Sequence, residues 1–555
     1  MALHLPAFQI HEVTYMAIYS LQRDFNYGEH WCCALTSDNT MLFAINQNRE
    51  YFILNKGDSK AKSLLSAFIA NKNIMLSWDK KLNIWCRECF EEMPINMMLS
   101  TLVKNITYEL ACYRAGVRQV HVKDNVKNDC ALQAQNILQI YNDYLYSKVY
   151  MILSLSKEYK INFLNTRPSA VIEKMPDLRP AYRKPVKQFY YQAPSFLRFD
   201  TPVFQKLFND IVSHEFVVKG GSITHPCLPQ TIEVGNITAK IGVGGLHGFS
   251  SDINRASDEN NVLNDWDIHA FYPSMICKEP ILQSIFGKDF VNEISKILEQ
   301  RDKLRHTNTE LSMGLKEVLN SATGNLNNTG SKMYNPQAYI QITLTGQLYI
   351  LMIADTCIKH GIPVLSINTD GLTVLDNANA TDTSEAIIKR AELMTGLVFE
   401  KTMFKKYYGN NVNNYLAFKS DNELKTRGSY SNKRELDKMN NNLAVNKLVV
   451  RVLSDGGEPA QYLKELKVED FVNMASSNVS NESVRFYKAK NTQSIALRFA
   501  NGVTIPKSDG CAIVNDFEPL ETILHNIDYD YYLDQAQQFV NNIEPAWKKL
   551  ISPIW

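Results

Sequence analysis

The sequence lacks long apolar runs, and it lacks an excess of charge of either sign. Its N-terminus, MALHLPAFQIHEVTYM, has no basic flank followed by a long apolar stretch. We therefore expect neither a signal peptide nor a membrane contact. Lys and Arg number 59 against 58 Asp and Glu, which gives a net charge of +1. Bulk charge thus excludes a strongly basic nucleic-acid binder, and any nucleic-acid site must be a local basic surface.

Cysteine patterns typical of metal sites or disulfide frameworks are also scarce. The ten cysteines are scattered. Cys32 and Cys33 are adjacent, and Cys86-x-x-Cys89 has no second pair at the spacing of a zinc ribbon. The pair is therefore interpreted as structural rather than metal-binding. The sequence predicts a reduced, intracellular protein located in the cytoplasm.

With 555 residues, 45% of them hydrophobic, the chain is too long for one core, and two to four domains are expected. Residues 1–150 have a mixed α/β pattern, with a strand–turn–strand over 31–45 and helical patterns near 60–72 and 130–157. A basic stretch punctuated by prolines, 165–195, is typical of a domain seam. Short strands are predicted between 198 and 250. No internal repeat is present, and the fold class expected is α/β (α+β).

The middle of the chain carries the clearest element patterns. A strand is expected over 261–276, and then two helices over 287–306 and 309–328. Thr307 and Glu310 have the spacing of a capping box for the second helix. A further helix is predicted over 338–360, and the two β-rich runs of 362–375 flank a turn and predict a hairpin.

Two aspartates in this region lie where carboxylates are unusual. Asp267 stands among the apolar residues of the predicted strand, and Asp370 stands at the tip of the predicted hairpin. Taken singly, each has a plain structural interpretation, because an Asp-Gly turn needs no function. Between them, Arg301 and Arg305 share one helix face. Lys316 and Asn320 share another, and such cations are usually a solvated face.

The order of these residues is harder to dismiss. The segments 267-DIHAFYPS-274, 316-KEVLNSATG-324 and 368-NTDG-371 resemble motifs A, B and C of family B DNA polymerases. The bacteriophage-type members are the most similar, including over 242-GVGGLHG-248 and 341-QITLTGQLYILM-352. The resemblance covers roughly residues 195–430 and is weak on either side. It implies a template-directed DNA polymerase, acting on a primer-template with dNTPs.

The resemblance implies a role for each matching residue. Asp267 and Asp370, with the backbone carbonyl of Ile268, would hold two Mg²⁺ ions, for which Mn²⁺ is a substitute. Phosphoryl transfer needs positioning and charge neutralisation more than covalent chemistry, and two metal ions supply both. Arg301 and Lys316 would clamp the triphosphate.

Further residues complete the implied nucleotide site. Arg305 is an additional candidate for the triphosphate clamp. Asn320, one turn after Lys316, would lie near the incoming base and sugar. Tyr272 would lie beneath the sugar as the steric gate that excludes a 2′-hydroxyl.

The motifs depart from the family pattern at three places. Asn368 replaces the first carboxylate of motif C. As a neutral amide it can still accept a hydrogen bond or coordinate weakly, and we expect activity to survive. Thr323 replaces a tyrosine at the end of motif B. Ala270-Phe271 replaces Ser-Leu in motif A.

DNA contacts are implied by weaker signals. Gly244 and Gly245 lie where such polymerases carry a glycine-rich turn, which lets backbone approach a template phosphate. Residues 401–450 hold ten Lys or Arg against four Asp or Glu, an excess that suits a duplex-binding surface. Within it, Tyr415, Lys425 and Arg427 are the candidate DNA contacts. Asn413 or Asn414 stands where the family has a lysine.

Family B polymerases carry a proofreading exonuclease before the palm, and its motifs are eroded in this chain. In 19-YSLQRDFNY-27, Ser20 and Gln22 stand at the two carboxylate positions. In 141-YNDYLYSK-148, Leu145 takes the place of the aspartate, and 77-SWDKKLN-83 retains only Asp79. Asp24 and Asp143 lie close enough to rescue a site if the alignment shifts. Without carboxylates two metal ions cannot be held, so an inactive, RNase H-like domain is expected.

The predicted division follows a right-hand polymerase. Residues 1–160 form the exonuclease-like domain and 161–195 a linker. Residues 196–286 and 325–430 form the palm, 287–324 the two-helix fingers, and 431–555 the thumb or C-terminal region.

Two alternatives remain open. One is a primase-polymerase or reverse transcriptase, which primer-free synthesis or use of an RNA template would favour. The other is a polymerase-derived DNA-binding accessory protein without catalysis, which Asn368 and the eroded exonuclease motifs keep open. Replication accessory proteins or a terminal protein are further expected partners.

Overall fold

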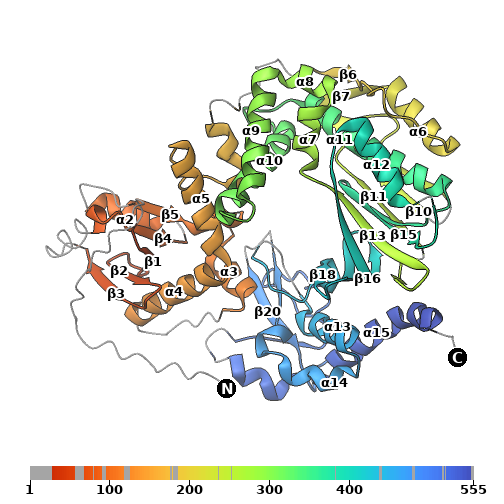
Figure 1. Ribbon diagram of the computed structural model, residues 1–555. Coiled ribbons are helices and arrows are strands. Elements are labelled where there is room, and N and C mark those ends of the chain that lie inside the picture. The colour runs from red at the N-terminus through yellow and green to blue at the C-terminus, as the bar shows by residue number, and fades with distance from the viewer. Residues whose placement is uncertain are drawn as a thin grey trace.

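The computed structural model describes most of residues 28–551. Outside the description lie 57–67, 79, 90–94, 105, 118–125, 176–177, 179–185, 235–236, 252, 382, 437–440, 478–481, 516–517 and 519, and the side chains of 126–128, 410 and 544–551. Figure 1 shows the N-terminal sheet, the helices α9 (Lys288–Leu304) and α10 (Thr309–Gly324), a large sheet and the C-terminal region placed around the centre of the view.

The N-terminal part contains a five-stranded sheet in the order β3-β2-β1-β4-β5. The first three strands are antiparallel, and β4 and β5 continue in parallel from β1. Their bounds are β1 (His30–Leu35), β2 (Met41–Asn46), β3 (Tyr51–Asn55), β4 (Ile74–Ser77) and β5 (Ile95–Met98). The predicted strand–turn–strand over 31–45 is present, with Asn39 in the left-handed region that its turn requires.

Helices cover this sheet and continue from it. They are α2 (Lys81–Cys89), η1 (Leu99–Val103), α3 (Tyr108–Ala115), α4 (Val126–Ile140), the π-helical turn η2 (Tyr141–Leu145) and α5 (Tyr146–Tyr159). The mixed α/β pattern and the helical pattern over 130–157 are confirmed. Most of the helical pattern near 60–72 lies outside the described residues.

A buried histidine makes this part of the molecule sensitive to acid. His30 lies within 2.6 Å of the Tyr141 hydroxyl through its Nδ1, and burial lowers the pKa of His30 to about 4. Between pH 6.5 and 4, His30 is therefore protonated in the unfolded chain and neutral in the folded chain. The free energy of unfolding falls as the pH is lowered through that window.

We expect the opening free energy of the five-stranded sheet to drop by about 2 kcal/mol from pH 7 to pH 5 because of His30. Hydrogen exchange of the β1 and β2 amides, corrected for intrinsic rates, measures it. The variant His30→Gln removes the titrating group and should lose this pH dependence. An equal pH dependence in both proteins would contradict the assignment.

The large sheet has ten strands in the order β18-β17-β16-β13-β15-β14-β11-β10-β9, with β12 paired to β16. Its strands are β9 (Gln230–Val234), β10 (Ile237–Ile241), β11 (Leu246–Ser250), β12 (Arg255–Ala256), β13 (Asn261–Ile268), β14 (Val364–Ile367), β15 (Gly371–Asn377), β16 (Phe399–Asn411), β17 (Asn414–Lys419) and β18 (Leu424–Arg427). The predicted hairpin over 362–375 is β14–β15, and it pairs β15 directly with β13 at the centre of the sheet.

The side chains of the strand β13 lie on two different faces of the large sheet. Side chains alternate between faces along a strand. Trp266 points to the helical side, where its Nε1 donates a 2.8 Å hydrogen bond to Ser384 Oγ, so Asp265 and Asp267 point to the opposite face.

The expectation of a strand over 261–276 is wrong in its second half, because Phe271–Lys278 is the helix α7. Ala270, at φ 43°, turns the chain, and Pro273 lies in the first helical turn, where no amide hydrogen is needed.

The helices of this part of the chain are α6 (Pro202–Ser213), α7, α8 (Pro280–Phe286), α9, α10, η5 (Asn325–Asn327), α11 (Pro336–Lys359) and α12 (Ser384–Thr395). Of these, α9, α10 and α11 were predicted close to their observed bounds, whereas α7 and α8 were not predicted. The strand-only expectation for 198–250 missed α6. α11 is buried along most of its length, and its buried residues include the polar Gln341, Gln347 and Asp355. The predicted capping box of α10 is absent, because Asn308 is the N-cap and accepts from Leu311 N at 3.0 Å.

The helix α10 joins the N-terminal part to the large sheet. It packs on α5, where a Cβ at Gly314 would lie 2.7 Å from Leu155 Cγ, so only glycine permits this approach. It also packs on η3 (Pro168–Lys174), a described piece of the proline-punctuated stretch. The strands β6 (Gln188–Tyr190), β7 (Glu215–Lys219) and β8 (Ser222–Thr224) form a separate small sheet.

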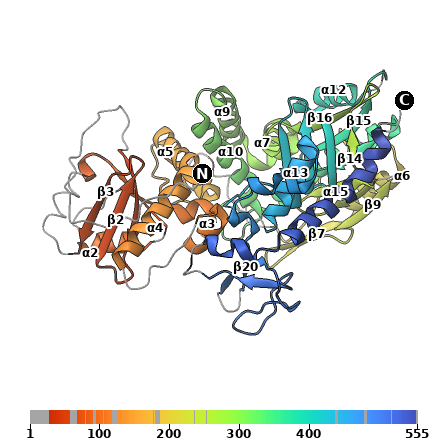
Figure 2. The ribbon, with the colours of Figure 1, turned by 90° about the horizontal axis from the view of Figure 1, so that it is seen from below.

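The C-terminal region contains a small sheet of the strands β19 (Asn473–Ser476), β20 (Ser483–Lys488) and β21 (Cys511–Ile513). Its α-helices are α13 (Leu443–Asp455), α14 (Pro459–Tyr462) and α15 (Tyr529–Ile551). Short 3₁₀ turns are η6 (Gly428–Tyr430), η7 (Leu463–Glu465), η8 (Val468–Phe471) and η9 (Leu520–Asn526). It contacts the N-terminal part through Tyr113, whose hydroxyl donates to Asn441 Oδ1 at 2.9 Å. Figure 2 shows the five-stranded sheet and the large sheet at opposite ends of the molecule. Among the residues that the structure describes, no helix has the length and apolarity needed to span a membrane.

Candidate active site

Two adjacent strands bring the predicted aspartates together. In the β13–β15 ladder Asp267 is the register partner of Gly371. The Ile268 amide donates to the Asp370 carbonyl at 2.9 Å, and the Asn368 amide donates to the Gly371 carbonyl at 2.8 Å. These bonds fix the hairpin tip beside the end of β13. Asp267 and Asp370 therefore line the same pocket, as the sequence predicted for adjacent strands.

Gly371 is required by this close pairing. A Cβ at this position would lie 2.3 Å from the Trp266 carbonyl oxygen and 2.5 Å from Asp267 Oδ1. Both distances are far inside van der Waals contact, and the first partner is backbone that cannot move aside. The Asp-Gly of the hairpin is thus more than a turn signal, because the glycine sets how near Asp370 comes to Asp267.

The pocket at this position has a volume of about 320 Å³. Its walls are mostly polar and come from β13, β14–β15, and the β16–β17–β18 edge of the sheet. The lining residues are Asp265, Asp267, Ser366, Asn368, Asp370, Gly371, Leu372, Thr373, Tyr407, Val412, Asn413, Tyr415, Lys425 and Arg427. The predicted DNA contacts Tyr415, Lys425 and Arg427 are thus brought to the same place as the two aspartates.

The electrostatics of the pocket act on Asp267. Partial burial of the carboxyl, reinforced by the charges of Asp265, Asp370 and Glu400, raises the pKa of Asp267 to about 7, against an opposing effect of Lys425. Like charges held close together favour the protonated form. A cation bound between these carboxylates would reverse that balance and keep Asp267 ionised.

Asp265 is a pocket residue that the sequence interpretation missed. It is buried, its Oδ1 accepts from Thr373 Oγ1 at 2.7 Å, and its Oδ2 accepts from Lys425 Nζ at 3.2 Å. The signal was present in the sequence, because residues two apart on a strand share a face. Asp265 and Asp267 should therefore have been considered as a pair.

The glycine turn lies against the hairpin tip. A Cβ at Gly245 would lie 3.3 Å from Thr369 Oγ1, and one at Gly244 would lie 3.0 Å from the Tyr339 hydroxyl. The Thr369 hydroxyl also donates to the Leu246 carbonyl at 3.5 Å. The turn between β10 and β11 is therefore next to the hairpin tip, and its predicted contact with a template phosphate stays a prediction.

Tyr272 lies under the hairpin rather than in open solvent. Its ring stacks on Phe271 at 5.4 Å between centroids, and a Cβ at Gly346 would approach it to 3.1 Å. The Tyr272 hydroxyl is buried without a hydrogen-bond partner among the described residues. Burial, with the neighbouring Tyr339 and Asp370, raises the pKa of Tyr272 and keeps it neutral.

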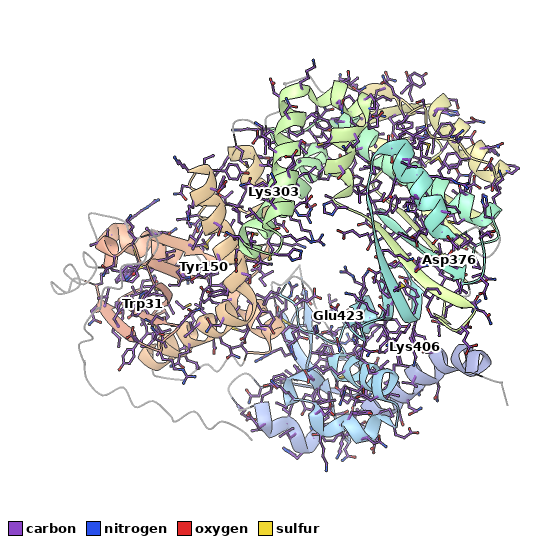
Figure 3. All side chains as sticks on the ribbon, in the orientation of Figure 1. Trp31, Tyr150, Lys303, Asp376, Lys406 and Glu423 are labelled. Carbon is purple, nitrogen blue, oxygen red and sulfur yellow. The ribbon has the colours of Figure 1, made fainter. Side chains whose placement is uncertain are left out.

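All four predicted side chains of the helix pair are at least partly exposed. Arg301 is half-buried, and Lys316 and Asn320 are exposed on α10. Ser312 Oγ donates to the Arg301 carbonyl at 3.2 Å, which holds α10 against α9 at this level. Neither Arg301 nor Lys316 makes an ion pair within the part of the chain described. Figure 3 labels Lys303 on α9, at this end of the helix pair.

Arg305 is differently placed. It follows the last residue of α9, and its Nη1 donates to Glu400 Oε1 at 2.8 Å. Glu400 is the register partner of Asp267, so this ion pair puts the end of α9 beside the pocket. His269 joins the same group, within 2.9 Å of Glu400 and 3.1 Å of Asp302. Arg305 is therefore engaged by protein, unlike Arg301, and its predicted place in the triphosphate clamp stays a prediction.

The donor set of the pocket fits Mg²⁺. In the residues described, no three His, Cys, Asp or Glu side chains are grouped as a complete metal site. Mg²⁺, however, is commonly held by one or two carboxylates together with water and substrate phosphates. The side chain of Asp267 is 48% exposed and Asp370 is exposed. Both carboxylates are open to a cation, and Asn368 adds an exposed amide oxygen.

Most of the predicted exonuclease positions cannot be placed, and those within the described residues carry no cluster of carboxylates. Ser20, Gln22, Asp24 and Asp79 lie outside the described residues. The central strand β1, HWCCAL, holds no carboxylate. Leu145 is fully buried in the π-helical turn, and Asp143 is exposed.

A pocket of about 190 Å³ opens at the ends of β1 and β4. Asp129 is the one carboxylate among its lining residues, and the thiols of Cys33 and Cys130 also line it. A single carboxylate beside two thiols is a poor match to the carboxylate ligands that Mg²⁺ requires.

Comparisons with known proteins find distant likenesses among the solved structures alone. No family model matches the sequence, and no curated protein matches it. Among solved structures, the family B DNA polymerase from the hyperthermophilic archaeon Pyrobaculum calidifontis is similar, with a TM-score of 0.43 and 9% sequence identity over 96% of this chain and 79% of that chain. A score this low does not establish a shared fold. The function proposed below therefore depends on the residues of the site and their contacts.

Proposed function

We propose that this protein is a template-directed DNA polymerase of the family B kind, most similar in its motifs to bacteriophage members. The observation that carries the proposal is the pairing of β13 with β15, which puts Asp267 and Asp370 in one polar pocket. Beside that pocket stands a helix pair whose Arg301 and Lys316 make no ion pair with any residue that the structure describes. The proposed substrates are a DNA primer-template and deoxynucleoside triphosphates.

The chain's own residues bind and orient the reactants. Arg301 and Lys316 lie on neighbouring helix faces, which suits a triphosphate whose charge must be opposed. Asn320 is one turn further along α10, where a base or sugar would follow. Tyr272, packed against Phe271 and Gly346, offers a rigid aromatic wall for the sugar. Because this packing holds the Tyr272 ring in place, the ring would exclude a 2′-hydroxyl by steric clash.

Asp267 and Asp370, with the carbonyl of Ile268, would hold two Mg²⁺ ions, and Mn²⁺ would be an acceptable substitute. When bound, such ions stabilise the attacking and leaving oxygens of an in-line displacement. The contribution of this chain is the fixed separation of the two carboxylates, set by the ladder and by Gly371. Lys425, Arg427 and Tyr415 line the side of the pocket where the basic segment would contact DNA.

Extension of a labelled DNA primer on a DNA template, with Mg²⁺ and either dNTPs or rNTPs, tests the proposal. We expect extension with dNTPs and strong discrimination against rNTPs. Reactions without a primer, and reactions on an RNA template, serve as comparisons. Efficient synthesis in either of them would favour a primase-polymerase or a reverse transcriptase instead.

A second candidate function is a DNA-binding accessory protein derived from a polymerase. The observation that favours it is Asn368, an exposed amide that lines the pocket where motif C of the family has its first carboxylate. Tight DNA binding without any extension would support this function. A replication accessory protein or a terminal protein would then be the partner to search for.

Proofreading should be absent. A primer with a mismatched 3′ end, incubated with Mg²⁺ and without nucleotides, should keep its length over a time in which a proofreading polymerase degrades it. The reason is that β1 carries no carboxylate and Leu145 is buried, which leaves too few ligands for two metal ions. Shortening of the primer would contradict this prediction.

A further inference from the structure

Lys425 occupies a fixed position in the carboxylate pocket. Its Nζ lies 3.2 Å from Asp265 Oδ2 and 4.0 Å from Asp267 Oδ2. It also stands 5.7 Å from the ring centroid of Phe404 and 5.9 Å from that of Tyr415, distances at which a cation is attracted to an aromatic face. These contacts hold the Lys425 ammonium in one position, unlike the side chain of a mobile surface lysine.

Lys425 lies on β18, the strand at one edge of the large sheet. β18 is separated from β13 by β17 and β16 in the strand order. The β16–β17 ladder changes register between Phe404 and Lys406, and such a bulge bends the strand that carries it. Lys425 on β18 reaches the face on which Asp265 and Asp267 lie, as its contact with Asp265 shows.

Asp265 is the residue that fixes this cation. It is 8% exposed, and the Thr373 hydroxyl from the neighbouring strand orients its carboxylate. Asp265 and Asp267 are two apart on β13 and face the same lysine. The shorter distance and the better-buried partner belong to Asp265, so Lys425 pairs with Asp265 first.

We infer that Asp265 is a positioning residue for the proposed metal site, because it retains Lys425 and so leaves the charge of Asp267 for divalent cations. Without Asp265, the ammonium would move onto Asp267, the nearest remaining carboxylate, and would compete with a metal ion for it. The inference rests on the proposed function, since it presumes that Asp267 and Asp370 bind metal. It goes beyond that function by assigning a role to a buried aspartate outside the three motif positions.

Binding of Mn²⁺ alone, measured by electron paramagnetic resonance on the full chain, tests the inference without reference to activity. The site of interest is the one that Asp267→Asn removes. We expect Asp265→Asn to weaken Mn²⁺ binding at this site about tenfold, the scale of a close charge pair. Asp376→Asn is the matched control, because it neutralises another buried aspartate of the same sheet and should leave Mn²⁺ binding unchanged.

A double-mutant cycle separates retention of Lys425 from a simple loss of negative charge. Lys425→Met should change Mn²⁺ affinity little in the native background, where Asp265 holds the lysine. In the Asp265→Asn background the same substitution should restore most of the lost affinity. An equal effect of Lys425→Met in both backgrounds means that the two charges act independently, and it overturns the inference.

Two further results complete the test. If Asp265→Asn does not fold, Thr373→Val removes the hydroxyl that orients Asp265 while leaving its charge, and it should weaken Mn²⁺ binding in the same direction; unchanged binding overturns the inference. If the native protein binds no Mn²⁺ that Asp267→Asn removes, the proposed metal site itself is wrong. An additive cycle in a protein that does bind Mn²⁺ contradicts only the role of Asp265.

Discussion

Asp267→Asn and Asp370→Asn should each lower the rate of primer extension by about 1000-fold, because a lost metal ion removes several kcal/mol of transition-state stabilisation. Asparagine keeps the size of each side chain and one oxygen, so the β13–β15 ladder is retained. What is lost is the negative charge that holds a divalent cation. Asp267 should be the more sensitive position, since it is fixed within the sheet while Asp370 is exposed at the hairpin tip.

Single-turnover extension of an annealed primer, at saturating dNTP, measures this effect apart from product release. DNA affinity should remain within a few-fold of the native value, because neither carboxylate opposes a phosphate directly. Asp376→Asn again serves as the control, since Asp376 is buried in the same sheet and bonds to Asn264 and Ser384 away from the pocket. Normal extension by both Asp267→Asn and Asp370→Asn would refute the catalytic proposal.

Much of the site could be predicted because its elements follow local rules. The paired helices, the long apolar helix α11 and the β14–β15 hairpin all carry strong periodic patterns. The adjacency of Asp267 and Asp370 followed from the motif order. The strand β13 was drawn too long, because nothing local signals that Ala270 adopts φ 43° and starts a new helix at Phe271.

The contacts that were missed join distant segments of the chain. Asp265 meets Lys425 across 160 residues of sequence, and Arg305 meets Glu400 across 95. Each pair forms only because the bulged strand β16 and the end of α9 come to β13. Such contacts are properties of the tertiary structure, and they cannot be inferred from a single sequence.

The importance of Gly371 likewise follows from the packing. In the sequence it is the second residue of an Asp-Gly turn, which any hairpin can use. In the structure its hydrogen faces the Trp266 carbonyl and Asp267 Oδ1 at distances that no Cβ tolerates. The glycine is therefore required by the neighbouring strand rather than by its own turn. Any larger residue must push β15 away from β13 at the point where the two aspartates meet.

Gly371→Ala should consequently reduce primer extension by at least about 100-fold, since displacement of a catalytic group by roughly 1 Å has an effect of that size. The protein should still fold, because overpacking at one position costs only about 1–3 kcal/mol. Gly330→Ala is the matched control: its Cβ meets only Asn328 Oδ1, at an ordinary 3.5 Å. Single-turnover rates and Mn²⁺ affinity should fall together in Gly371→Ala and stay native in Gly330→Ala. Native activity in Gly371→Ala would show that the spacing between β13 and β15 does not control the reaction, and that the carboxylates act from a different arrangement.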